Sequence, residues 1–186
     1  KKGFGARRLE VMQNRFVLLG PADDPANIKD AATVSSAFKA IAKSRSRFLS
    51  RGDDSGTHTR ERRLWSEAGI NLSSASGSWY LEAGQGMGAS INLAVQLKAY
   101  LLSDISTWLA FGNKSRHRLL YEDTSDSLLN RYSVLTVNPA HCPFVNQAGA
   151  NRFADWLSSI EGQEQIAAFT LDGQQMFLPA NHSSRR

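Results

Sequence analysis

The sequence predicts an α/β fold with a largely parallel sheet. Short apolar runs of strand length alternate with segments whose apolar residues recur at helical spacing. Of the 186 residues, 41% are hydrophobic and 21% are charged, which is ordinary material for a packed core. No apolar run approaches the ~20 residues of a membrane-spanning helix. Disordered and fibrous chains are excluded, and a soluble globular protein is expected.

The first half of the chain repeats the order strand, polar turn, helix. The predicted strands are residues 15–21, 46–50, 79–82 and 99–104. The predicted helices are marked by Val34, Ala37, Phe38 and Ile41, by Leu64, Trp65 and Ala68, and by Ile91, Ala94, Val95 and Lys98. Asp30 or Thr33 is the expected cap of the first helix.

The second half becomes helical toward its end. A short helix is expected at 105–111, and strands are expected at 119–122 and 132–137. After the cap candidate Asn146, a helical stripe is formed by Phe153, Trp156, Leu157 and Ile160. Residues 163–169 extend this helix, and residues 181–186 form a polar tail.

The charge balance favours anionic partners without naming one. Lys and Arg number 22 against 17 Asp and Glu, giving +5 and a pI near 9.6. The most basic stretch, residues 43–63, is interrupted by acidic residues and contains a single aromatic residue, Phe48. No nucleic-acid partner is therefore expected. The single cysteine, Cys142, excludes an intramolecular disulfide and a Cys-rich metal site. No metal site is expected from the four scattered histidines.

The turn at residues 51–57 predicts an oxyanion site. It precedes a helix whose first N–H groups have no acceptor within the helix. The amides and hydroxyls of Ser55, Gly56 and Thr57 can donate to one anion there, and the planar guanidinium of Arg51 can hold two of its oxygens. Asp53 or Asp54 would fix that guanidinium or cap the helix. The alternative is an ordinary capped helix beside a surface ion pair.

The turn at residues 84–88 has two functional interpretations and a structural one, in which its glycines only let the helix approach the sheet. Gly84-x-Gly86-x-x-Ala89 matches the dinucleotide-binding pattern, with Asp104 about 20 residues further on. The preceding strand is polar and aromatic, which argues against a dinucleotide. In the other interpretation, the N–H groups of Gly86, Met87 and Gly88 face the same anion as the first turn.

An enzyme is not expected. Asp53, Asp54, Thr57 and His58 offer acid, base and nucleophilic groups, but no third orienting group follows at an interpretable spacing. His58 follows Thr57 directly on a helix and so points to a different face. His117, His141 and His182 lie in predicted polar loops or the tail, and we expect no specific role for them.

Several segments resemble the tungstate-binding proteins of bacterial ABC importers. They are residues 50–58 (SRGDDSGTH), 79–88 (WYLEAGQGMG) and 132–139 (YSVLTVNP), with 11–17 (VMQNRFV) and 153–157 (FADWL) continuing the likeness in register. The resemblance covers nearly the whole chain. It implies a class II periplasmic binding-protein fold, in which two α/β lobes joined by a hinge close over an oxyanion.

The resemblance also implies site residues, partners and a location. Arg51 and Thr57 would contact the ligand directly, with Ser55 and Gly56 beside them. The contribution of Gly86 to Gly88 is an inference from helix geometry alone. The partner would be an importer permease and the location periplasmic or extracytoplasmic, with no cofactor and no membrane insertion.

The sequence departs from the family in its first lobe. The Thr/Ser-rich turn that opens family members is absent, so residues 1–33 and 130–186 are expected to form only part of the first lobe. Residues 34–129 would form a complete second lobe carrying the oxyanion half-site. Upstream residues, or a partner such as a second copy of the chain, would then complete the first lobe.

Asp53 distinguishes two classes of anion. Phosphate-binding proteins of related importers also carry Arg-x-Asp-x-Ser-Gly-Thr, which residues 51–57 match. Phosphate keeps a proton that an inward-facing carboxylate can accept, whereas tungstate and molybdate have none and would be repelled. Asp53 turned away from the ligand favours tungstate or molybdate, and the other motifs favour tungstate. Residue types do not separate tungstate from molybdate.

Overall fold

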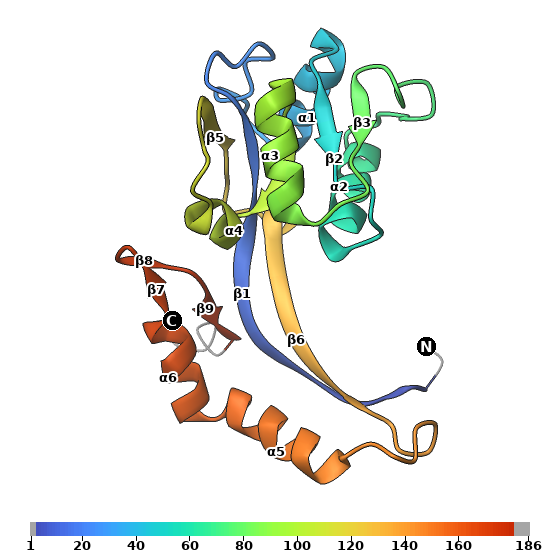
Figure 1. Ribbon diagram of the computed structural model, residues 1–186, viewed down its shortest axis with the longest axis vertical. Coiled ribbons are helices and arrows are strands. Elements are labelled where there is room, and N and C mark those ends of the chain that lie inside the picture. The colour runs from blue at the N-terminus through green and yellow to red at the C-terminus, as the bar shows by residue number, and fades with distance from the viewer. Residues whose placement is uncertain (1–2, 181–186) are drawn as a thin grey trace. The chain divides into compact units, whose positions relative to one another are not determined.

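The computed structural model describes residues 3–180 and divides the chain into two compact units. Unit 2 is Arg15–Leu129, and unit 1 is Lys1–Asn14 with Asn130–Arg186. Two strands run from one unit into the other: β1 (Gly5–Pro21) and β6 (Leu129–Val137) (Figure 1). The expected lobe division differs in residues 15–33, which belong to unit 2. The predicted polar tail, 181–186, lies outside the described residues.

Unit 2 follows the predicted alternation of strands and helices. Its further elements are α1 (Val34–Ser44), β2 (Phe48–Ser50), α2 (Gly56–Glu67), β3 (Tyr80–Glu82), α3 (Met87–Leu97), β4 (Leu101–Asp104), α4 (Ile105–Ala110), β5 (His117–Tyr121) and the 3-10 turn η1 (Asp126–Leu128). The predicted cap Thr33 is confirmed, since its side chain accepts from the Ser36 amide. Lys98 is not on a helix face as predicted, because it ends α3 in the left-handed conformation.

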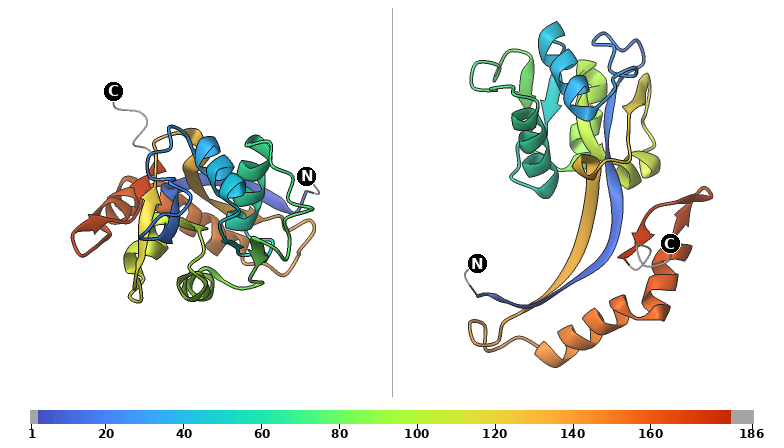
Figure 2. Two further views of the ribbon diagram at one scale, coloured as in Figure 1. Left: turned by 90° about the horizontal axis from the view of Figure 1, so that it is seen from above. Right: turned by 180° about the vertical axis from the view of Figure 1, so that it is seen from behind.

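The strands of unit 2 lie between two helical layers (Figures 1 and 2). Successive strand side chains point to opposite faces, so Leu18 and Val17 of β1 enter different apolar clusters. One cluster joins Leu18 to α1 and α2, and the other joins Val17 to α3 and α4. Between these helical layers, the carboxyl ends of β2 and β3, where the predicted turns begin, lie at the same edge of the sheet.

The sheet is not largely parallel, as the sequence had suggested. β2 and β3 are parallel, and Phe48 forms a parallel bridge to Tyr100 beside β4. β1, however, runs antiparallel to β4 and β5 and lies between them. A crossover helix predicts parallel direction only for the two strands that it joins, and β1 is not joined to either neighbour in this way.

Unit 1 combines the ends of the long strands with the C-terminal helices. Its elements are α5 (Gln147–Ser158), α6 (Ile160–Ala168), β7 (Thr170–Leu171), β8 (Gln174–Gln175) and β9 (Leu178–Pro179). β1 pairs there with β6 and, at Met12, with β9. The sequence missed the strand at 5–14, because its few apolar residues are interrupted by Arg, Glu and amide side chains and form no run of strand length.

The C-terminal helix is two helices, and its apolar stripe is exposed. The predicted cap Asn146 is confirmed, but the helix stops at Ser159, which caps α6 through the Gly162 amide. Within unit 1, Phe153 is 57% exposed and Ile160 81%. An apolar groove of about 550 Å³ lies beside them, lined by residues of β1, β6, α5 and α6. Helical periodicity identified an apolar face here but not a buried one.

Candidate functional site

Two strand-to-helix loops meet at one edge of unit 2. β2 and β3 are parallel neighbours with Ser50 opposite Glu82, so both loops leave the sheet at its carboxyl edge. The Ala83 amide donates to the Ser50 carbonyl at 2.9 Å, and the Gln85 amide donates to the Arg51 carbonyl at 3.2 Å. The structure therefore brings together the two turns that the sequence singled out separately.

The first loop presents the N-terminus of α2. Ser55 is the N-cap, and its hydroxyl accepts from the His58 amide at 3.3 Å. Gly56 and Thr57 follow as the first helical residues, whose amides have no acceptor within the helix. The space around Gly56 is open, with no heavy atom within 4 Å of the position a Cβ would take. An anion can therefore approach these amides.

Arg51 and Asp53 form a pair beside this helix end. The Arg51 guanidinium donates to Asp53 through Nη2, and the other Asp53 oxygen accepts from the Ser55 amide at 3.3 Å. Burial acts against ionisation of Asp53, but hydrogen bonds from Ser55 and Arg51 hold its pKa below the usual range. Both carboxylate oxygens thus have partners within the loop. Arg51 Nε is buried and has no acceptor among the described residues.

His58 is the residue of this loop that the sequence did not select. Its Nδ1 accepts from the Asp54 amide at 3.1 Å, so in the neutral ring Nε2 carries the proton. That Nε2 is buried and unpartnered within the described part of the chain. Asp54 has positive φ and a fully exposed side chain, so it neither fixes Arg51 nor caps the helix. His58 is the third residue of the helix, and side chains at that position often reach back to bond the residues before the helix. That tendency is the sequence signal that could have identified it.

The second loop presents the N-terminus of α3. Gly86 is its N-cap and makes no side-chain cap hydrogen bond. The Met87 side chain packs into the core, so Met87 can offer a ligand only its amide. Gly88 borders open space. Asp104, which the dinucleotide pattern would require for a ribose, instead caps α4 by accepting from Thr107 at 2.9 Å and 2.6 Å.

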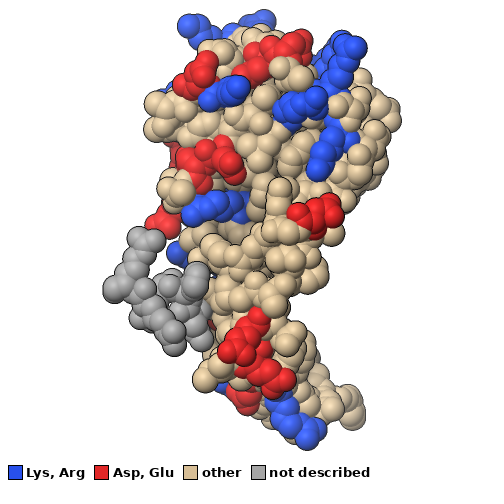
Figure 3. Space-filling view, turned by 90° about the vertical axis from the view of Figure 1, so that its left-hand side faces the viewer, with Lys and Arg blue, Asp and Glu red and all other residues tan. Residues whose placement is uncertain are grey.

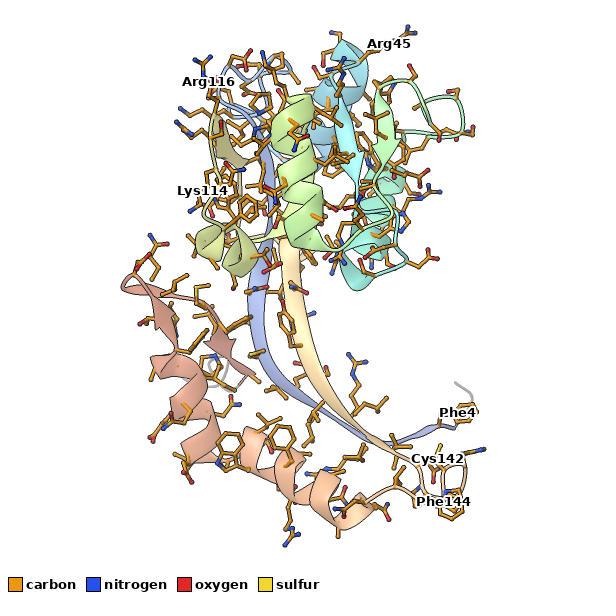
Figure 4. All side chains as sticks on the ribbon, viewed as in Figure 1. Phe4, Arg45, Lys114, Arg116, Cys142 and Phe144 are labelled. Carbon is orange, nitrogen blue, oxygen red and sulfur yellow. The ribbon has the colours of Figure 1, made fainter. Side chains whose placement is uncertain are left out.

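The positive charge of unit 2 does not form a continuous stripe. Arg45 and Arg116 project outward from unit 2 (Figure 4), whereas the Lys114 ammonium folds back over the Trp108 ring. Acidic and basic side chains are interspersed on the face shown in Figure 3. The excess charge therefore does not outline a nucleic-acid groove on that face.

His117 does not lie in a polar loop, as the sequence suggested. It begins β5 with 2% exposure, and its Nε2 lies 2.9 Å from the Ala99 carbonyl. Burial lowers the pKa of His117. Among residues 3–180, no group of three or more His, Cys, Asp or Glu is arranged to hold a metal ion. Within the same residues, no helix combines the length and the apolar character needed to cross a bilayer.

Comparison with known proteins gives consistent matches. The PBP-like model, described as a PBP superfamily domain, matches residues 1–161. The tungstate-binding protein TupA of Peptoclostridium acidaminophilum is 36% identical over 95% of this chain and 62% of its own length. The tungstate-binding protein TupA of Desulfovibrio alaskensis G20 is 39% identical with a TM-score of 0.77, covering 95% of this chain and 71% of that one.

A second solved structure agrees. The structure described as the tungstate ABC transporter from Geobacter sulfurreducens is 41% identical with a TM-score of 0.80, over 90% of this chain and 69% of that one. The predicted α/β binding-protein fold is thereby confirmed. The chain spans about half to two thirds of the length of the curated relatives that it matches.

Proposed function

The chain belongs to the PBP superfamily and, within it, to the family of the tungstate-binding proteins, and from this premise we propose that it captures tungstate or molybdate for an ABC importer. The relatives are transport proteins that bind an oxyanion rather than enzymes. The proposed partner is the importer permease, and the proposed place of action is outside the cytoplasm.

One observation carries this proposal: Arg51 Nε is a buried donor with no acceptor among residues 3–180, beside the open N-terminus of α2. A buried unsatisfied N–H is costly, so such a group is explained by a ligand that accepts from it. The proposed contacts are those of the Arg51 guanidinium, the hydroxyls of Ser55 and Thr57, the amides of Gly56 and Thr57, and the amides of Gly86, Met87 and Gly88. His58 Nε2, in the first turn of α2, is a further donor that has no partner within the described residues.

The position of Asp53 supports tungstate or molybdate over phosphate. Both of its oxygens accept hydrogen bonds inside the loop, from Arg51 and from Ser55. These hydrogen bonds also lower the pKa of Asp53. With both oxygens occupied, the Asp53 carboxylate is not free to accept a hydrogen bond from a phosphate hydroxyl. Asp53 serves in this proposal to orient Arg51, and Asp54 lies outside the contact shell.

Calorimetric titration tests the proposal, using the protein with tungstate, molybdate, phosphate and sulfate in turn. We expect saturable heat with tungstate and molybdate and at least tenfold weaker binding of phosphate. Binding of phosphate in preference to both metal oxyanions would assign the site to the alternative anion. Absence of binding to any of the four would refute an oxyanion site.

A further inference from the structure

A buried carboxylate lies directly behind the two oxyanion loops. Glu61 is on α2, five residues after its first residue Gly56, or about 7 Å along the helix axis. Its side chain is in the core and the residue is 2% exposed. Burial without an ion pair costs a carboxylate a large desolvation free energy, so its position calls for an explanation.

Glu61 is bonded to β3 and lies close to β2, the two strands that end in those loops. Its Oε1 accepts from the Tyr80 hydroxyl at 2.8 Å, and Tyr80 is the first residue of β3. The Ser50 side chain, on the last residue of β2, is close enough to the carboxylate to favour its ionised form. A third donor is Trp65 Nε1 at 3.1 Å, one turn further along α2. One carboxylate thus joins α2 to β3 and lies close to the last residue of β2.

The connection continues into the first loop. Ser50 directly precedes Arg51, and its Oγ accepts from the Gly52 amide at 3.2 Å. The Ser50 carbonyl accepts from Ala83 at the start of the second loop. A change in the hydrogen bonding of Glu61 therefore reaches the backbone on both sides of the proposed anion.

The surroundings of Glu61 allow it to gain a proton near neutral pH. The charged and titratable groups that act on it are Tyr80 from β3 and Arg62 from α2, while Ser50 from β2 is neutral. α1 faces this region with apolar Phe38, whose ring packs edge-on against Trp65. Desolvation by burial raises the pKa of Glu61 to about 7, although hydrogen bonds from Tyr80 and Trp65 and the nearby Ser50 side chain act to lower it.

We propose that Glu61 is a positioning residue for the oxyanion loops and takes up a proton when the anion binds. This inference rests on the proposed function. An incoming dianion at the start of α2 disfavours a second negative charge on the same helix, so the protonated form of Glu61 binds the anion more tightly. Affinity consequently falls as pH rises through the pKa of Glu61.

Calorimetry of tungstate binding between about pH 6.5 and pH 8.5 tests this, with each titration repeated in two buffers of different ionisation enthalpy. We expect the natural protein to take up a fraction of a proton per tungstate and to bind about tenfold less tightly at the upper pH, the effect of one pKa unit of coupling. Glu61→Gln keeps an acceptor for Tyr80 and Trp65, and we expect it to bind without proton uptake and with a flat pH profile. Glu67→Gln, at a partly exposed ion pair on the same helix, should keep the natural profile.

Tyr80→Phe provides a second measurement if Glu61→Gln fails to fold. Removing this donor to the ionised carboxylate raises the pKa of Glu61, so the fall in affinity should move to higher pH. Equal proton uptake and equal pH dependence in the natural protein and in Glu61→Gln would overturn the inference while leaving the proposed function intact. Absence of tungstate binding by the natural protein at every pH would instead refute the proposed function, and the inference with it.

Discussion

Replacing Arg51 by alanine should abolish most of the affinity for tungstate. In the structure Nη2 is engaged with Asp53, which leaves Nε and Nη1 to donate to an anion. Two hydrogen bonds to a charged group at about 1.5–3 kcal/mol each amount to at least about 3 kcal/mol, or more than a hundredfold in Kd. The variant also leaves Asp53 without its cation, so its negative charge adds repulsion.

Isothermal titration of tungstate into the two proteins measures this loss directly. Arg63→Ala is the matched control, because Arg63 lies on α2 with a 68% exposed side chain paired to Glu67. It should change Kd by less than about twofold, since exposed ion pairs contribute little. Arg51→Lys keeps the charge without the planar fork and should recover only part of the affinity. A Kd for Arg51→Ala within threefold of the natural protein, or equal losses in both alanine variants, would refute the role given to Arg51.

Three further predictions concern stability, each measured by urea unfolding. Gly52→Ala should lower the free energy of unfolding by about 2 kcal/mol, because φ at Gly52 is +59° and the new Cβ would lie 2.9 Å from Glu82 Cβ. The control Gly69→Ala, also at positive φ but in open space, should lower it by about 1 kcal/mol. Ser55→Ala should cost about 1 kcal/mol through loss of the cap hydrogen bond, and an unchanged midpoint would contradict the capping role. Because the pKa of Glu61 is raised from 4.5 to about 7, its protonation stabilises the folded state. This contribution to the free energy of unfolding is complete below pH 4.5 and is lost as pH rises through about 7. The free energy of unfolding should therefore fall by up to about 3 kcal/mol between about pH 5 and pH 8. Glu61→Gln should remove this slope, and a slope that persists in the variant would assign it to other groups.

Periodicity predicted local structure well where a helix packs on the sheet. Val34, Ala37, Phe38 and Ile41 were selected by their spacing, and all four are the buried residues of α1. The same criterion selected Phe153 and Ile160, which are exposed in unit 1. Spacing shows which side chains share a face, but it contains no information about what covers that face.

The candidate site was predicted as two separate turns, and only the pairing of strands brings them together. The register of Ser50 with Glu82 is a long-range property that no local pattern encodes. The part played by Asp53 was left open between two orientations, because the direction of a short side chain in a turn depends on the backbone dihedral angles there. His58 and Glu61 were passed over for a similar reason, since their significance lies in which atoms are buried and which are paired.

The indole of Trp65 gives the molecule a natural optical label. It is 1% exposed, its N–H donates to Glu61, and its ring meets Phe48 edge-on at 5.0 Å between centroids. Indole fluorescence responds to the charge of a hydrogen-bonded neighbour, so the emission of Trp65 reports the protonation of that carboxylate. In a variant that keeps Trp65 and replaces the other three tryptophans, the proposed capture of an anion can then be followed by stopped-flow mixing without attaching a dye.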